Sequence, residues 1–152
     1  MDRSSAWIAL ASGTLAALLL QPREPPQHVK GGELALELVR VGPEGQLRTP
    51  NGFLSEDRFK VVLTCPPAWR GYVDVLAFQG AETTAPLTTQ RIDSCGNRRT
   101  LQGAFRLTGN TVISVCVVFS ANAPLDRDRL PNMPSLPAED WVCQTLQPNS
   151  VR

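Results

Sequence analysis

Short apolar runs, each ended by glycine or proline, limit the fold of this chain more than any other feature of its sequence. From Phe59 to Cys65, every second residue is apolar or a cysteine, and Pro66 and Pro67 end the run. A period of two residues is that of a strand with one buried face, and proline does not continue a strand inside a sheet. The same reasoning predicts strands over the following ranges: Glu33–Val41, Arg58–Cys65, Gly71–Gln79, Leu101–Leu107, Thr111–Ser120 and Asp140–Leu146.

A hairpin is predicted where two of these strands meet at Thr108, Gly109 and Asn110, because glycine and asparagine adopt the backbone angles of tight turns. The strand after this turn, Thr111–Ser120, has apolar residues on both of its faces. Strands that are covered on both sides have this composition. We therefore expect Thr111–Ser120 to lie in the middle of a sheet.

Helix-favouring runs are scarce after residue 20, and glycine and proline are frequent, with 11 and 13 copies. These features predict an all-β fold. Strands of this number and spacing are typical of an immunoglobulin-like two-sheet sandwich, with a small β-barrel as the alternative, preceded here by one N-terminal apolar helix. The expected organisation is a membrane anchor or signal segment at 1–20, a connector rich in proline and glycine at 21–32, the β-sandwich at 33–147 and a tail at 148–152.

The N-terminal segment Ala6–Leu20 contains no charged residue and is expected to contact a membrane. As a helix it measures roughly 22 Å, which is short for a hydrocarbon core of about 30 Å and favours a cleaved signal peptide. The residues that follow the apolar run offer no small-residue cleavage site, which favours an uncleaved anchor. We prefer the anchor and keep the cleaved signal as the alternative.

Four cysteines, Cys65, Cys95, Cys116 and Cys143, are spread through the predicted β domain without a Cys-x-x-Cys pair. Because close ligand spacing is missing, no metal site is expected. An even number of cysteines behind an export segment is typical of two disulfides formed in an oxidising compartment, with four reduced buried thiols as the alternative. The charges that flank Ala6–Leu20 are nearly balanced, so the cysteines place the domain outside the membrane, in the periplasm.

Four cysteines permit three disulfide pairings. The strand pattern places Cys65 on the same face as the core residues of its run. The placement of the strands favours a bond between Cys65 and Cys116, which leaves Cys95 to pair with Cys143.

Catalysis is not expected. The only histidine, His28, lies in the connector, whereas serine and cysteine nucleophiles commonly need a histidine base inside the folded site. The common motifs for acyl transfer, zinc hydrolysis and nucleotide binding do not occur, and we expect no cofactor. The formal net charge of +1 provides no large basic face, so nucleic acid is not an expected partner.

Five residues are candidates for contact with a partner. Arg98 and Arg99 follow a short turn, where two guanidinium groups could bind an anionic group. Trp69, Tyr72 and Trp141 could line a ligand cleft or a partner surface, because aromatic residues concentrate in such places. The alternatives are solvated arginines in a turn and aromatic packing in the core or at a sheet edge.

Several stretches of the sequence resemble a known family. Lys30-Gly31-Gly32 opens a strand behind the apolar segment, and further stretches are LSEDRFKVVLT at Leu54–Thr64, GYVDVLAFQ at Gly71–Gln79 and CGNRRTLQGAFRLTG at Cys95–Gly109. On these, over most of its length, the chain resembles Gram-negative envelope domains that are often encoded beside, or fused to, membrane-bound anti-sigma factors of extracytoplasmic-function sigma factors. The resemblance implies the outer part of such a protein alone, without direct binding of a sigma factor and without catalytic residues.

The sequence therefore favours a non-enzymatic, membrane-anchored periplasmic interaction or sensing module. By its resemblance, such a module would be an accessory to envelope signalling. We expect it to contact an unknown protein or envelope ligand through loops such as Ala123–Pro137. The alternatives are a secreted, soluble β domain that binds a small ligand, and a hydrolase that the motifs do not reveal.

Overall fold

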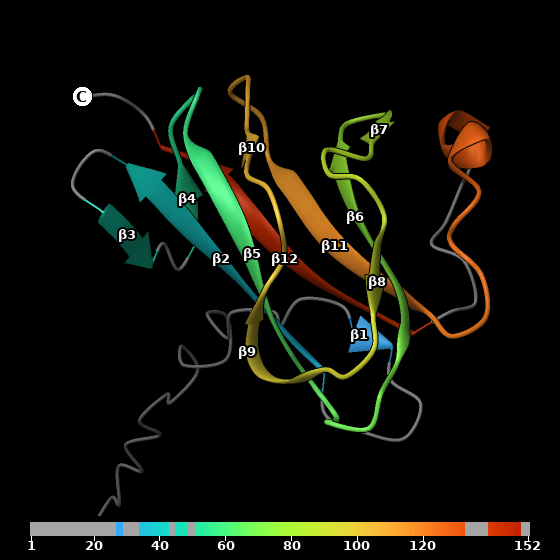
Figure 1. Ribbon diagram of the computed structural model, residues 1–152. Coiled ribbons are helices and arrows are strands. Elements are labelled where there is room, and N and C mark those ends of the chain that lie inside the picture. Colours follow the sequence, from blue (N-terminus) through green and yellow to red (C-terminus); the bar gives the residue numbers. More distant parts are fainter. Residues whose placement is uncertain (1–26, 29–33, 43–44, 49–50, 133–139, 150–152) are drawn as a thin grey trace, which may run out of the picture.

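The computed structural model describes residues 27–28, 34–42, 45–48, 51–132 and 140–149 (Figure 1). The segment Ala6–Leu20 and its expected helix lie outside these residues. In the described ranges, no helix has both the length and the apolar character needed to cross a membrane. The elements are β1 Gln27–His28, β2 Ala35–Gly42, β3 Gly45–Arg48, β4 Gly52–Phe53, β5 Arg58–Cys65, β6 Gly71–Gln79, β7 Glu82–Thr84, β8 Gln90–Ile92, β9 Gly96–Thr100, β10 Phe105–Arg106, β11 Ile113–Ser120, the 3-10 helix η1 Arg127–Asn132 and β12 Asp140–Pro148.

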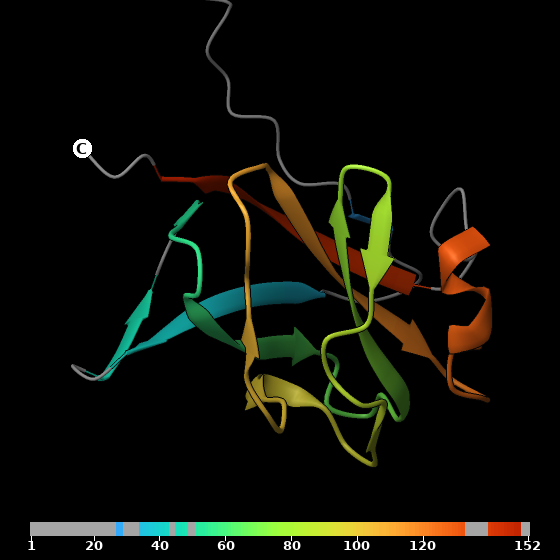
Figure 2. The same ribbon diagram turned by 90° about the horizontal axis from the view of Figure 1, so that it is seen from above.

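These strands form two sheets that pack face to face (Figure 1, Figure 2). The β11 sheet has the order β1-β12-β11-β6-β7, with β4 beside β12 and β8 beside β6. The β5 sheet has the order β10-β5-β2-β3, with β9 beside β5. The prediction of an all-β fold with two sheets is confirmed. Two residues of the predicted connector, Gln27 and His28, join the β11 sheet by pairing with Val142 and Trp141.

The long strands agree well with the sequence pattern. β5 and β6 have the predicted bounds, and β2, β11 and β12 differ from prediction by at most two residues at either end. The pattern does not predict β3, β4, β7, β8 or β9, because strands of two to five residues contain too few alternations to be recognised.

The predicted hairpin at Thr108–Asn110 is wrong. The range Leu101–Leu107 contains only β10, which pairs with β5, whereas β11 pairs with β6 and β12. The chain therefore passes from one sheet to the other at this turn. Alternation shows which face of a strand is buried but not which strand lies beside it, and Phe105 and Leu107 fill the core from the side of the β5 sheet.

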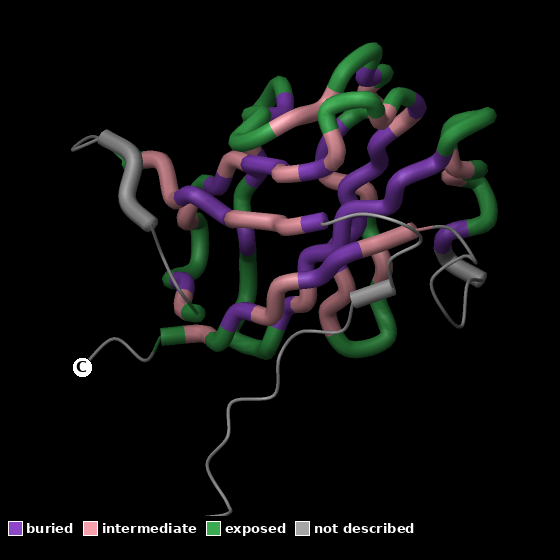
Figure 3. The backbone as a smooth tube through the Cα atoms, turned by 90° about the horizontal axis from the view of Figure 1, so that it is seen from below, coloured by how far each residue is buried: buried purple, intermediate pink, exposed green. Residues whose placement is uncertain are grey.

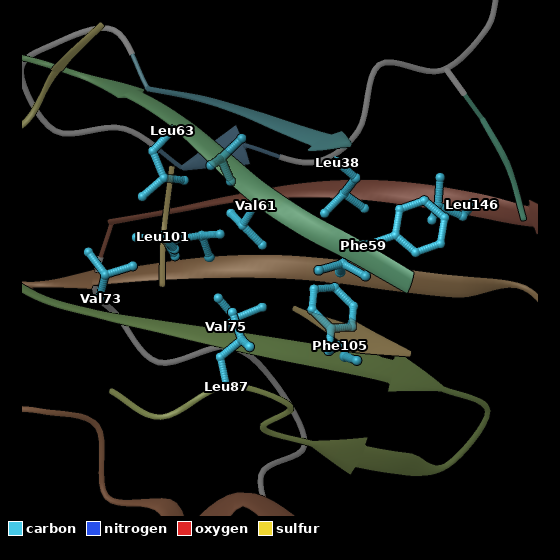
Figure 4. Packing of buried hydrophobic residues seen from close by; sticks show 14 of the residues in the cluster. Leu38, Phe59, Val61, Leu63, Val73, Val75, Leu87, Leu101, Phe105 and Leu146 are labelled. Atoms are coloured by element: carbon cyan, nitrogen blue, oxygen red, sulfur yellow. The ribbon is translucent and has the colours of Figure 1, made fainter. Parts of the chain in front are cut away.

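The main core lies between the sheets (Figure 4). Phe59, Val61 and Leu63 point into it from β5, and Val73 and Val75 from β6. These side chains are almost completely buried, and each contributes about 2 kcal/mol to stability on an area basis. The space between the two sheets is therefore filled by closely packed apolar side chains.

β11 is central, with β6 on one side and β12 on the other. Val115 and Val117 face the main core, whereas Val118 faces the opposite, outer side of the β11 sheet. There it forms a second apolar cluster with Leu76 and Leu130. Figure 3 shows the buried residues concentrated in the strands and the exposed ones in the connections. The prediction that β11 is covered on both sides is confirmed.

Two disulfides are present, and their pairing corrects the prediction. Cys65 is bonded to Cys95, and Cys116 to Cys143. Cys65 belongs to the main core, as predicted, but Cys116 faces the outer side of its own sheet, so the β11 sheet separates these two cysteines. Cys116 and Cys143 are directly opposed on β11 and β12, with their Cα atoms 4.0 Å apart.

Candidate functional site

Trp69 packs inward. Its ring meets the ring of Phe119 edge-on, with centroids 5.2 Å apart and planes at 89°. Its backbone carbonyl accepts a hydrogen bond of 3.2 Å from the amide of Cys95, beside the Cys65–Cys95 disulfide. Trp69 therefore closes one end of the main core, and the packing alternative applies to it.

Arg98 and Arg99, on β9, are both engaged within the protein. The Nη1 of Arg98 lies 2.7 Å from Oε2 of Glu37, and the Nη1 of Arg99 donates to the carbonyl of Ser94 at 2.7 Å. Arg98 also has a φ of 55°, in the left-handed region. The two guanidinium groups tie β9 to β2 and to the turn before it, and they point to different partners.

Trp141 lies on β12, opposite Val118, and packs against the second apolar cluster. Tyr72 lies on the same outer face, because it is opposite Ser120, two residues along β11 from Val118. Trp69 faces the core, and Arg98 and Arg99 belong to the β5 sheet. The structure therefore divides the five predicted contact residues among three places: the core, the outer face of the β11 sheet, and β9.

Asp74, which was not among the predicted site residues, has a completely buried side chain on the outer face of β6. Thr89 Oγ1 donates to Oδ1 at 2.6 Å, and the amide of Leu125 donates to Oδ2 at 3.1 Å. Arg127 donates to Oδ1 from Nε at 3.2 Å and from Nη2 at 2.7 Å. Both the charge and the hydrogen-bonding capacity of this buried carboxylate are thus met.

These bonds hold loop 121–132 against the β11 sheet. Leu125 and Leu130 of the loop pack onto the second apolar cluster, and η1 contacts β7. Figure 1 shows η1 beyond β7, at the edge of the β11 sheet. The sequence signal for this attachment of the loop is the single carboxylate within the apolar stretch Gly71–Gln79, because a buried acid needs a partner.

A pocket of about 150 Å³ lies where loop 121–132 begins. We call it the Tyr72 pocket; its lining residues are Arg70, Gly71, Tyr72, Arg91, Ile92, Asp93, Ala121 and Asn122. The adjacent ends of β6, β8 and β11 form it, since Tyr72 is opposite Arg91 on one side and Ser120 on the other. Gly71 is required here, because a Cβ would collide with the carbonyl oxygen of Ser120.

A second pocket, of about 110 Å³, lies at the opposite end of the sandwich, and we call it the Gln79 pocket. Its apolar lining is Ala77, Pro86, Phe105, Leu107 and Ile113, and its polar lining is Gln79, Glu82, Thr84, Arg106 and Thr108. Gln79 Nε2 is fixed by donating to the carbonyl of Thr108 at 3.1 Å and to Oγ1 of Thr111 at 2.9 Å. This pocket combines an apolar interior with polar groups at its edge.

The two pockets contain one carboxylate each, Asp93 and Glu82. Within the part of the chain that the structure describes, no three His, Cys, Asp or Glu side chains are grouped to hold a metal ion. Comparisons of the chain with protein families, with curated proteins and with solved structures find no match.

Proposed function

We propose that this protein is a non-enzymatic interaction module of the bacterial envelope, held at the membrane by Ala6–Leu20, that binds a partner with the end of the sandwich where loop 121–132 begins. The observation that carries the proposal is the ion pair between Asp74 and Arg127, in which Nη2 lies 2.7 Å from Oδ1. It fixes a long connection against a rigid sheet, next to a pocket. Loops that are positioned in this way on a stable scaffold commonly carry binding functions.

The two disulfides support the location. Disulfides persist in oxidising compartments, of which the bacterial periplasm is one. The proposal also takes the sandwich to be immunoglobulin-like, a fold in which the loops at the two ends are the usual binding sites. The resemblance to domains that accompany membrane-bound anti-sigma factors supports a role as an accessory to envelope signalling.

The Gln79 pocket supports a second candidate function, the binding of a small ligand. Its apolar interior and fixed polar groups are the usual components of a ligand site, although its volume of about 110 Å³ admits only a small group. The hydrolase alternative gains no support from either pocket, because each contains a single carboxylate.

Site-specific photo-crosslinking in cells that express the full chain tests the proposal. Benzoylphenylalanine is placed at Asn122, beside the Tyr72 pocket, or as a matched control at Asn110, in the turn at the opposite end of the sandwich. Both positions are exposed asparagines, so the reporter disturbs neither core. We expect a light-dependent adduct of higher mass with the reporter at residue 122 and none with it at residue 110.

Three results contradict the proposal. Without an adduct at either position, no partner contacts this end of the molecule. Equal adducts at both positions indicate collision without a specific surface. An adduct at residue 110 alone moves the binding site to the end that contains the Gln79 pocket.

A further inference from the structure

We propose that the Tyr72 pocket binds a carboxylate group of the partner, presented by a glutamate or aspartate side chain of an acidic peptide segment. This inference rests on the proposed function, because it names the chemical group with which the partner enters the pocket. It concerns Arg70 and Arg91, neither of which was among the predicted site residues.

The register of the strands gathers the charged groups on one face. Tyr72 on β6 is directly opposite Arg91 on β8, so their Cβ atoms lie about 5 Å apart. Arg70 directly precedes β6, and Asp93 directly follows β8. All four line the pocket. Two arginines, a tyrosine and an aspartate therefore border one small space.

Buried residues form the inner wall of this space, and exposed residues form its edge. Ile92 is 1% exposed and Gly71 is buried, and the backbone at Gly71 lies directly against Ser120. Arg70, Asp93, Ala121 and Asn122 are exposed and form the edge. A volume of about 150 Å³ accepts a carboxylate with its methylene stem, and the rest of a ligand stays outside on the exposed surface. This geometry favours a side chain that projects from a longer segment.

Neither arginine of the pocket is held by a buried acid. Arg70 forms no ion pair with any described residue. Arg91 Nε lies 3.5 Å from Oδ1 of Asp93, but the two side chains are 72% and 88% exposed, so water competes for both groups and the pair is weak. By contrast, Arg127 is bound by a buried acid at 2.7 Å.

The net charge of the pocket points to a carboxylate. Two guanidinium groups and one carboxylate give +2 − 1 = +1, which a single negative charge neutralises. Planar guanidinium groups match the planar carboxylate with two parallel hydrogen bonds, and the Tyr72 hydroxyl and the Asn122 amide are further donors. A phosphate group carries nearly twice the charge at neutral pH and would leave the site negative.

The test is a nuclear magnetic resonance titration of the full, ¹⁵N-labelled chain in dodecyl maltoside micelles. The probe is acetyl-Gly-Glu-Gly-amide, with acetyl-Gly-Gln-Gly-amide as the uncharged control and inorganic phosphate as a separate arm at matched ionic strength. We expect the Glu peptide to move the amide signals of Tyr72, Ile92 and Asn122 along saturable curves, and the Gln peptide to leave them in place.

Variants test the charge assignment. Arg91→Gln is expected to weaken binding of the Glu peptide at least about tenfold, because it removes a charged hydrogen-bonding fork. Asp93→Asn is expected to tighten binding, since it removes the acid that competes for Arg91. Arg58→Gln is the matched control, because Arg58 is an exposed arginine of β5 that does not line this pocket, and it should bind as the unsubstituted protein does.

Several outcomes overturn the inference: no saturable movement, equal movement with the Gln peptide, tighter binding of phosphate than of the Glu peptide, or equal weakening by Arg91→Gln and Arg58→Gln. The proposed function fails separately. An adduct at residue 122 without binding of the Glu peptide supports the interaction surface and contradicts the carboxylate as the group that is bound. Binding of the Glu peptide without an adduct supports a carboxylate-binding pocket and contradicts a partner at this surface.

Discussion

Arg127 is the counter-ion of a carboxylate that has no contact with solvent. Replacing it with alanine leaves Asp74 buried with only two uncharged donors, Thr89 and the amide of Leu125. Breaking a buried pair in this way is costly, but the Arg127 side chain is itself 31% exposed, which lowers the loss. We expect Arg127→Ala to reduce the free energy of unfolding by about 2 kcal/mol. Urea unfolding followed by tryptophan fluorescence, with the disulfides intact, measures it.

The matched control for this prediction is Arg129→Ala in the same loop. Arg129 pairs with Asp126 at 3.1 Å, but the two side chains are 80% and 57% exposed. Exposed pairs of this kind contribute about 0.5 kcal/mol or less. If the two substitutions lower stability equally, the Asp74–Arg127 pair does not anchor the loop.

At the scale of the elements, the disulfide pairing depends on which strands and turns are neighbours. Within the β11 sheet, Cys116 and Cys143 are cross-strand neighbours, whereas Cys65 on β5 reaches Cys95 in the turn before β9. A strand face is shared by residues two apart, so Val115 and Val117 take the core side of β11 and Cys116 takes the outer side. The bond that the sequence favoured, from Cys65 to Cys116, would have to pass through a sheet.

Tryptic digestion without reductant tests this pairing. The positions of lysine and arginine place the four cysteines in four different peptides, 61–70, 92–98, 107–127 and 130–152. We expect mass spectrometry to find 61–70 linked to 92–98, and 107–127 linked to 130–152. A link between 61–70 and 107–127 would restore the sequence-based pairing, and four free thiols would remove the argument for an oxidising compartment.

The alternation of side chains along the chain predicts the bounds of the long strands but not which strands pair. β5 and β6 follow directly from alternation and from the residues that end them. The turn at Gly109 was predicted to join two paired strands, yet it carries the chain from β10 in one sheet to β11 in the other. A turn residue specifies the local backbone angles, whereas the choice of partner strand depends on which side chains fill the core together.

At the scale of the whole molecule, the proposed anchor has a direct consequence. A retained, membrane-inserted Ala6–Leu20 segment predicts that the full chain is recovered with the membranes, and that it leaves them on addition of detergent and not of high salt. Intact-mass measurement should include residues 1–20. Recovery in the soluble periplasm, with a mass that lacks these residues, would instead establish the secreted form.

The residues of the candidate site were predicted only in part from the sequence. The sequence singled out Tyr72 for its aromatic ring, and Tyr72 does line a pocket, but Trp69, Trp141, Arg98 and Arg99 are engaged elsewhere. Arg91 was not singled out because it lies in β8, a strand of three residues with no recognisable pattern. Only the pairing of β8 with β6 reveals that Arg91 faces Tyr72.

By itself, the sequence determined the all-β class, the bounds of the long strands and the apolar faces of β5 and β11, because these depend on the spacing of side chains along one strand. The tertiary structure decided the disulfide pairing, the passage between sheets at Gly109 and the pocket at Tyr72. Each of these depends on which strands are neighbours. That choice is made by packing between residues far apart in the chain, about which local periodicity carries no information.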